Sequence, residues 1–302
     1  MKFRTEIILS PSDFKITHGC PIAMQGSCFA ENMAAKFSNA GFSIDLNPFG
    51  IAYNPFSLSQ NLNRLLDNRP YGIDELFKDN DIYHSFLHHS RFSGTDPDEV
   101  LTKINLRMEQ SLNFLQTAGL LIITFGTAFV YRLQSTGSVV SNCHKLPAGF
   151  FSYKRLTIDD IVMEWTNLVV RLQLFNPSLR ILFTVSPIRH WKDGAHENQL
   201  SKSILLLSID ELLRNHSSCV YFPAYEIVLD ELREYRFYSE DMLHPSSQAI
   251  DYVWEKLTVA WFDDETLKKA QEFEKARQAQ NHIPLHPESE AYRQFKEKTL
   301  KK

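Results

Sequence analysis

The chain has 302 residues, of which 32 are basic and 36 acidic, so its formal charge is −4. Hydrophobic residues make up 43% of the sequence, which is enough for a core and excludes disordered, collagen-like and low-complexity proteins. No strongly basic block offers a surface to phosphates, so we expect no nucleic-acid partner. The length fits one large domain, or at most two.

Four cysteines occur at positions 20, 28, 143 and 219, without a CxxC pair. This number and spacing fit neither a disulfide scaffold nor a structural zinc site. The first apolar stretch stops at Leu9, which is too short for a signal peptide, and the apolar run at 120–124 is too short for a membrane span. We therefore expect a cytoplasmic protein with free thiols and no membrane contact.

Apolar periodicity divides the chain into alternating strands and helices. Phe29, Met33 and Phe37 recur at helical spacing, and Asp96-Pro97 has the form of a helix start. The unbroken run LLIITF is typical of a central parallel strand. Strands separated by helices predict right-handed crossovers and a three-layer α/β/α sandwich around a parallel sheet. In chain order, the predicted elements are a strand at 21–25, a helix at 28–40, a strand at 42–46, helices at 55–68, 73–77 and 97–117, a strand at 120–125, a helix at 158–174, a strand at 180–185, a helix at 197–214, a strand at 220–223 and a helix at 247–261.

The composition changes near residue 263. Residues 1–262 read as one α/β domain, interrupted at about 69–95 by a polar, histidine-rich insertion. Residues 263–302 are rich in charge and begin with a helix that has few apolar positions, so we expect a helical extension. A solvated tail is the simpler interpretation. Contact with a partner, including a second copy of the chain in a homo-oligomer, is the alternative.

The first strand–helix junction reads Gly26-Ser27-Cys28. In a parallel α/β sheet, ligands bind at the carboxyl ends of the strands, and this junction puts a hydroxyl on a tight turn there. The helix N-terminus offers free N–H groups and the positive end of its dipole to a developing oxyanion. Taken alone, Ser27 is better explained as a helix N-cap, because serine caps greatly outnumber serine nucleophiles.

A second motif near the other end of the chain changes this balance. Asp241 precedes His244 by three residues, in a predicted loop ahead of the last helix of the domain. A serine nucleophile needs a base within hydrogen-bond reach, and that base needs an acid to orient it. The D-x-x-H pattern is weak by itself, but together with Ser27 it predicts a Ser–His–Asp triad.

These motifs also carry a family resemblance. Residues 26–30 spell GSCFA, and the chain resembles the GSCFA-domain family, a branch of the SGNH/GDSL-type hydrolases. The resemblance implies a flavodoxin-like fold and ester or acyl chemistry, with Ser27 as nucleophile, His244 as base and Asp241 as the acid that orients it. It covers most of residues 20–262. The further blocks that carry it are NPFGIAYNP at 47–55, FGTA at 125–128, NCHK at 142–145, SPIRH at 186–190 and DMLHPS at 241–246.

The oxyanion hole that the resemblance implies is incomplete in this sequence. Its three donors are the N–H of Ser27, a glycine N–H after the second strand, which matches Gly50, and an asparagine side chain after the third strand. Ala128 stands where that asparagine is expected, and losing one donor costs about 10²–10³ in turnover. Three residues are candidates to replace it: Asn54, Thr127 and Asn142.

Further residues are candidates for the walls of the pocket. Arg189 is suited to hold a carboxylate or phosphate group of a substrate. His84 and His88 are spaced like metal ligands on a helix, but no HExxH acid accompanies them, so we expect a packed or substrate-facing cluster and no metal. No nucleotide or calcium motif occurs, so no cofactor is predicted. The pocket candidates are Gly126, His89, His144, Arg189 and His190.

The sequence thus favours a cytoplasmic serine esterase that acts on a small ester or an O-acetylated carbohydrate, the substrate class that the resemblance implies. An O-acyltransferase that uses the same site is one alternative. A catalytically inactive binding module that keeps the fold is another, supported by the missing asparagine at position 128. A metal-dependent hydrolase built on the histidines at 84–89 is a third, which only copurifying metal would favour.

Overall fold

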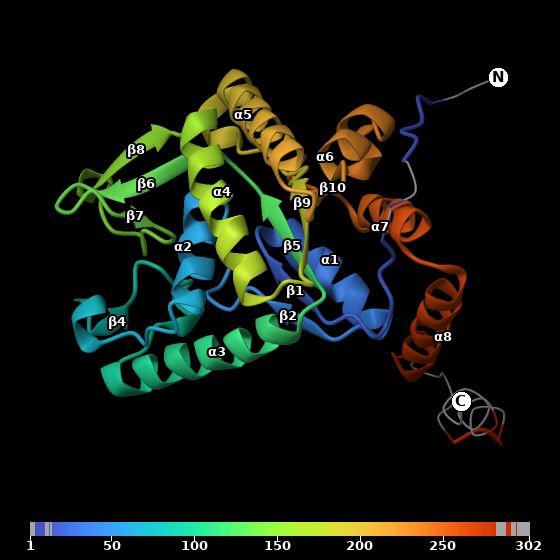
Figure 1. Cartoon of the computed structure of the whole chain (residues 1–302), viewed down its shortest axis with the longest axis horizontal. Coiled ribbons are helices and arrows are strands. Elements are labelled where there is room, and N and C mark those ends of the chain that lie inside the picture. Colours follow the sequence, from blue (N-terminus) through green and yellow to red (C-terminus); the bar gives the residue numbers. More distant parts are fainter. Residues whose placement is uncertain (1–3, 10–11, 13, 282–287, 291–293, 295–302) are drawn as a thin grey trace.

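The computed structural model describes residues 4–9, 12, 14–281, 288–290 and 294. Its central sheet has five parallel strands in the order β10-β9-β5-β1-β2 (Figure 1). Numbered along the chain within this sheet, the order is the 2-1-3-4-5 arrangement of flavodoxin-like folds, so the predicted fold class is confirmed. The strands are β1 (Ile22–Gln25), β2 (Ile44–Leu46), β5 (Leu120–Phe125), β9 (Arg180–Val185) and β10 (Cys219–Tyr221).

Helices cover both faces of this sheet and so produce the three layers. Helices α2, α3, α4 and α5 pack on one face, while α1 and α7 pack on the other. After β10, the short helix α6 continues into a π-helical segment. The helices are α1 (Cys28–Asn39), α2 (Pro55–Leu66), α3 (Pro97–Thr117), α4 (Ile158–Phe175), α5 (Gly194–Asn215), α6 (Ala224–Glu226), the π-helical segment (Ile227–Glu231), α7 (Ser247–Trp261) and α8 (Asp264–Asn281).

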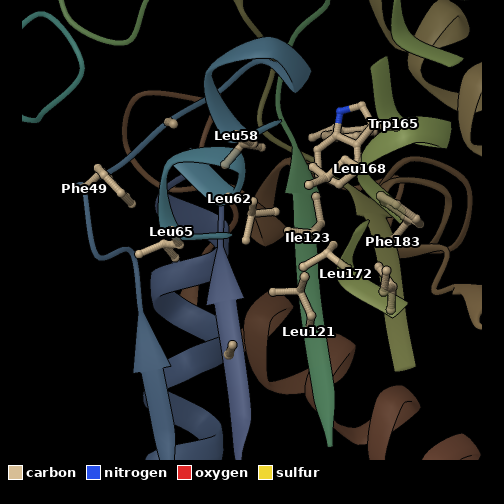
Figure 2. Packing of buried hydrophobic residues seen from close by; sticks show 14 of the residues in the cluster. Phe49, Leu58, Leu62, Leu65, Leu121, Ile123, Trp165, Leu168, Leu172 and Phe183 are labelled. Atoms are coloured by element: carbon tan, nitrogen blue, oxygen red, sulfur yellow. The ribbon is translucent and has the colours of Figure 1, made fainter. Parts of the chain in front are cut away.

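The core between the sheet and helices α2 to α5 is built around aromatic and leucine side chains (Figure 2). Side chains alternate along β5, so Leu121 packs toward these helices and Leu120 packs toward α1 and α7. Trp165 of α4 is fully buried, with its ring centroid 5.0 Å from that of Phe125 and 5.3 Å from that of Phe183. Because both faces of the sheet are covered, β5 needs the continuous apolar run that the sequence shows.

A second, antiparallel sheet interrupts the chain between β5 and α4, and the sequence did not predict it. Its strand order is β7-β6-β8. Tyr131 pairs with Tyr153 across the β6–β8 ladder, and the ring of Phe129 stacks on that of Tyr153 with centroids 4.8 Å apart. We call these three strands the accessory sheet. They are β6 (Phe129–Leu133), β7 (Val139–Val140) and β8 (Phe151–Arg155).

The histidine-rich insertion forms short elements over α3. The helix expected at 73–77 is only a 3-10 turn at Ile73–Glu75. An antiparallel hairpin follows, made of β3 (Phe77–Asp79) and β4 (Ile82–His84), and a second 3-10 turn lies at Ser90–Phe92. Segments this short leave the insertion dependent on packing against its neighbours.

Helix α8 lies against the domain. The ring of Phe273 packs on His18 with centroids 5.6 Å apart, and a Cβ on Gly41 would come within 2.5 Å of the Phe273 ring. Ala270 is buried in the same core cluster as residues of α1 and α7. Most of residues 282–302, the rest of the expected extension, lies outside the described residues. In the part of the chain that the structure describes, no helix is long and apolar enough to cross a membrane.

Candidate active site

A cavity of about 650 Å³ opens at the carboxyl ends of β1, β5 and β9, where this fold class binds its ligands. Ser27 follows β1, Thr127 follows β5 and Ser186 follows β9, and all three line the cavity. His244, from the loop before α7, lines it as well. The structure therefore brings the two sequence motifs to one place. The accessory sheet forms a further wall through Phe129, Tyr131, Val140, Phe151 and Tyr153.

The turn before α1 explains why Ser27 sits at the cavity. The N–H of Gly26 donates to Oδ1 of Asn47 at 2.9 Å. A Cβ on Gly26 would lie 2.6 Å from the Cβ of Thr124 in the neighbouring strand β5, so only glycine fits at this position. Ser27 is the N-cap of α1 and its Oγ accepts from the N–H of Phe29 at 3.3 Å. Its own N–H has no acceptor among the described residues, which leaves that donor free at the helix N-terminus.

The hydroxyl of Ser27 is directed at a second serine. Ser27 Oγ donates to Ser186 Oγ at 3.2 Å, and both residues are buried. No hydrogen bond joins Ser27 to His244 within the described chain, although both line the cavity. Catalytic hydrogen bonds in ligand-free enzymes are often long or poorly aligned and tighten when substrate binds. The ligand-free geometry thus places the two side chains at one cavity without joining them by a hydrogen bond.

His244 and Asp241 form a hydrogen-bonded pair in one tight loop. Oδ1 of Asp241 accepts from the N–H groups of Leu243 and His244, each at 2.9 Å, and Oδ2 contacts Nδ1 of His244 at 2.5 Å. These backbone bonds, followed by the imidazole bond, lower the pKa of Asp241 to about 2. Because Nδ1 faces the carboxylate, Nε2 is the nitrogen left to accept a proton.

Gly50 is held away from the cavity. Its N–H donates to Asn47 O at 2.8 Å within a turn, and the neighbouring Ile51, not Gly50, lines the cavity. With φ at 91°, Gly50 has a left-handed backbone, and an added Cβ would lie 2.1 Å from the Cβ of His89. Glycine is therefore required here by the turn and by the close approach of His89, and its N–H is engaged rather than offered to a ligand.

The two asparagines considered as replacement donors line the cavity but have other partners. Asn54 caps α2 by accepting from the N–H of Ser57 at 2.8 Å, and its amide donates to Ser57 Oγ at 3.0 Å. The amide of Asn142 donates to Ser90 Oγ at 3.4 Å, while its Oδ1 accepts from the N–H of His144 at 2.8 Å. The amide of Asn54 is held the more firmly of the two, since it is buried.

The third junction is organised by a serine from α5. Thr127 Oγ1 lies 3.1 Å from Ser201 Oγ and accepts from the N–H of Phe129, and the N–H of Ala128 donates to Ser201 Oγ at 2.8 Å. The side chain of Ala128 is fully buried, so this position points into the core and not into the cavity. The hydroxyl of Thr127 serves the local backbone in this arrangement.

Three of the pocket candidates line the cavity, namely His89, Arg189 and His190, while Gly126 and His144 lie outside its wall. Burial, with smaller contributions from the nearby charges of Lys202 and His244, lowers the pKa of His190 to about 4, so its imidazole is neutral at physiological pH. Within the described chain, no carboxylate forms an ion pair with Arg189. Arg189 is therefore a cation in this wall that is available to a substrate, and Lys192, which lines the cavity beside Tyr131, is a second.

His84 and His88 of the insertion belong to a packed cluster with His144. The rings of His84 and His144 lie 4.6 Å apart, and His88 is buried beside Tyr71, with ring centroids 4.8 Å apart. Burial lowers the pKa of His88 to about 3. Across the described residues, no three histidine, cysteine, aspartate or glutamate side chains are grouped so that they could hold a metal ion.

Sequence reasoning missed Lys202, which lies directly beneath the cavity. It is fully buried in α5, and its Nζ donates to the carbonyl oxygens of Gly126 and Ser186, each at 2.6 Å. Burial lowers the pKa of Lys202 to about 7. The available signal was the core-facing side of α5, where Asn198, Ser201 and Lys202 stand at helical spacing in line with buried leucines.

Comparison with known proteins extends this description. The sequence model of the GSCFA family matches residues 21–257, which run from the first strand of the sheet into α7. The chain belongs to the GSCFA family. In this GSCFA protein the matched region includes Ser27, Asp241 and His244, while α8 lies beyond it.

Three solved structures resemble this GSCFA protein at low sequence identity. The family 3 carbohydrate esterase of Clostridium thermocellum is 11% identical, with a TM-score of 0.39 over 83% of this chain and 98% of that chain. A carbohydrate esterase family 3 protein from Talaromyces cellulolyticus is 8% identical, with a TM-score of 0.37 over the same shares. An acetyl xylan esterase from the rumen bacterium Butyrivibrio proteoclasticus is 10% identical, with a TM-score of 0.40 over 81% of this chain and 64% of that chain. No curated protein matches the sequence.

Proposed function

We propose that this GSCFA protein is a serine esterase, in which Ser27 is the nucleophile, His244 the base and Asp241 the acid that orients it. One observation carries the proposal: Ser27 and His244, whose Nδ1 is hydrogen-bonded to Asp241, line the same open cavity, although more than 200 residues separate them in the sequence. The N-cap role of Ser27 alone would also suit an inactive binding module, but that role does not account for a histidine at the same cavity whose Nδ1 is oriented by a carboxylate.

The chemistry follows from these positions. Ser27 Oγ attacks the acyl carbon as its proton passes to Nε2 of His244, and the carbonyl electron pair moves onto the oxygen. The free N–H of Ser27 donates to this oxyanion. When the intermediate collapses, the bond to the leaving alcohol breaks and the alcohol takes the proton from His244. Water then releases the acyl group by the same sequence of steps.

Asp241 selects the tautomer of the base, His244, and stabilises the positive charge that the base acquires. Its pKa of about 2 keeps it ionised at physiological pH, so it holds the Nδ1 proton of His244 and stabilises the imidazolium that forms. The loop that carries both residues is fixed to α7, since Ser246 N–H donates to Phe237 O at 2.8 Å and Ser246 caps the helix. This fixes the orientation of the imidazole relative to the cavity.

The cavity favours a substrate larger than its acyl group. A volume of about 650 Å³ exceeds the space that an acetyl group fills, so most of it accommodates the alcohol part of the ester. Aromatic side chains of the accessory sheet and polar groups such as Asn142 and Arg189 line this space together. Such a mixture suits a polyhydroxy compound, and an O-acetylated carbohydrate is therefore the substrate class that we put first.

A serine-reactive fluorophosphonate probe tests the nucleophile directly. We expect labelling of the wild type, none of Ser27→Ala, and full labelling of Ser208→Ala, a control that removes a buried hydroxyl bonded within α5. An unlabelled wild type, or equal labelling of Ser27→Ala, would refute the assignment and favour a binding module. A panel of acetylated sugars, assayed for free acetate and for transfer to added sugar, then separates an esterase from an acyltransferase.

A further inference from the structure

The proposed esterase lacks an assigned donor for one part of its oxyanion hole. Ala128 is buried without a polar group, one amide proton of Asn54 is taken by Ser57 Oγ, and the hydroxyl of Thr127 pairs with that of Ser201. The N–H of Gly50 is committed to a turn. A donor that replaces the missing asparagine must line the cavity, lie within reach of Ser27 and have a proton that no other group accepts.

Ser186 meets all three requirements. It follows β9, lines the cavity, and places its Oγ 3.2 Å from Ser27 Oγ. That Oγ accepts two hydrogen bonds, one from the hydroxyl of Ser27 and one from the N–H of Ile188 at 3.3 Å. Within the described chain, no group accepts the proton of Ser186 itself. A hydroxyl beside the nucleophile whose proton has no acceptor among the described residues can donate that proton to a ligand in the cavity.

The backbone of Ser186 is fixed from below. Lys202 Nζ donates to the carbonyl oxygens of both Ser186 and Gly126, which ties the carboxyl ends of β9 and β5 to helix α5. The N–H of Ser186 donates to Phe125 O at 2.8 Å, so both backbone polar groups of the residue are occupied. A donor held in this way is preorganised, which is the property that makes hydrogen bonds effective in transition-state stabilisation.

We propose that Ser186 is a catalytic residue of this site, whose hydroxyl donates to the oxyanion in place of the missing asparagine, and that Lys202 is the residue that positions it. The assignment rests on the proposed esterase function. In the resting protein, Ser186 Oγ accepts a hydrogen bond from the hydroxyl of Ser27. Once that proton has passed to His244, Ser186 is free to turn its own proton toward the negative charge.

The step balances without any transfer from Ser186. The Ser27 Oγ–carbon bond forms, the carbonyl π bond becomes a lone pair on oxygen, and the proton of Ser27 moves to His244. The oxyanion is attached to the carbon that Ser27 has attacked, and the Ser186 hydroxyl, 3.2 Å from Ser27 Oγ in the resting protein, is adjacent to the place where that charge develops. Ser186 keeps its proton throughout and releases the hydrogen bond when the carbonyl re-forms.

A matched pair of substitutions tests this role. Ser186→Thr keeps the hydroxyl, and Ser186→Val replaces it with a methyl group at nearly the same volume. Both variants carry the same steric cost, so the difference between them reports the hydroxyl alone. We expect kcat on an aryl acetate to be about 10² or more higher for the threonine variant, with KM values within about threefold. A boronic acid that forms a tetrahedral adduct with Ser27 should bind the valine variant more weakly by a similar factor. A merely structural role would not produce this match between kcat and boronate affinity.

The outcomes separate the two proposals. Ser27→Ala is measured alongside, and if it retains wild-type turnover, the esterase proposal fails and the Ser186 assignment fails with it. If Ser27→Ala is inactive while the Thr and Val variants differ by less than tenfold in kcat, only the Ser186 assignment is overturned. Ser208→Ala, which removes a buried hydroxyl bonded to Ile204 O, should match the wild type in kcat and KM.

Discussion

Replacing Lys202 with methionine removes a buried amine while keeping an unbranched side chain of similar length. The native amine is fully buried, contacts two carbonyl oxygens and has a pKa of about 7, compared with an ordinary value of 10.5. A neutral amine carries two protons, and the structure supplies two acceptors. We therefore expect Lys202 to be largely neutral in the folded protein above pH 7 and charged in the unfolded chain up to about pH 10.5.

This difference makes the stability of the wild type depend on pH. Between pH 7 and 10.5 the unfolded chain binds one proton more than the folded protein at Lys202, so the free energy of unfolding rises with pH. The rise approaches about 1.4 kcal/mol per pH unit, or about 2–3 kcal/mol between pH 7.5 and 9.5. Lys202→Met lacks the titrating group, so this contribution disappears and the free energy of unfolding of the wild type minus that of the variant rises with pH by the same amount.

Urea unfolding followed by tryptophan fluorescence at pH 7.5, 8.5 and 9.5 measures this difference. All other titrating groups are common to both proteins and cancel in the difference. Lys154→Met, which removes an exposed lysine of β8, is the control. Its free energy of unfolding should change with pH by the same amount as that of the wild type. A gap between the wild type and Lys202→Met that stays constant over this range would refute the reasoning, because it would mean that Lys202 remains an ammonium ion in the folded protein.

Two further substitutions follow from the geometry of the site. Asp241→Asn should fold normally and lower kcat by about 10²–10⁴, because the side chain no longer selects the Nδ1–H tautomer of His244. The assay is kcat on an aryl acetate, with circular dichroism as the control for folding. A loss of kcat below threefold would contradict the prediction. Gly50→Ala should lower the free energy of unfolding, measured by the same urea titration, by at least about 2 kcal/mol. The added Cβ would clash with His89, and the residue has a left-handed backbone that disfavours alanine. Gly149→Ala is the control and should be near neutral, because no atom lies within 4 Å of its added Cβ.

The central sheet and its helices were predictable because their signals are long and of one kind. The run at Leu120–Phe125 is apolar throughout, and α3 begins at an Asp-Pro pair, so both elements match the prediction closely. The accessory sheet gave no comparable signal. Its strands β6 and β8 have five residues each and β7 has two, so each offers too few positions for a period to stand out from the surrounding loops.

The candidate site follows from the sequence where motifs mark residues of a given chemistry, and not where packing decides. Ser27, Asp241 and His244 stood out in the sequence because their chemistry requires those residue types. The turn that occupies the N–H of Gly50 depends on the path of the chain around His89, which no local pattern reveals. Lys202 was overlooked because a lysine in an amphipathic helix is normally taken to face water.

The accessory sheet arises from one continuous segment, residues 129–155, which leaves the main sheet after β5 and returns to it at α4. It supplies a wall of the cavity, while Ser27 and His244 come from elsewhere in the chain. In the proposed esterase, this wall of the substrate cavity and the motifs that carry Ser27 and His244 are thus encoded in separable stretches of sequence. Exchange of this segment between relatives offers a route by which substrate preference can diverge while the proposed hydrolytic centre is inherited unchanged.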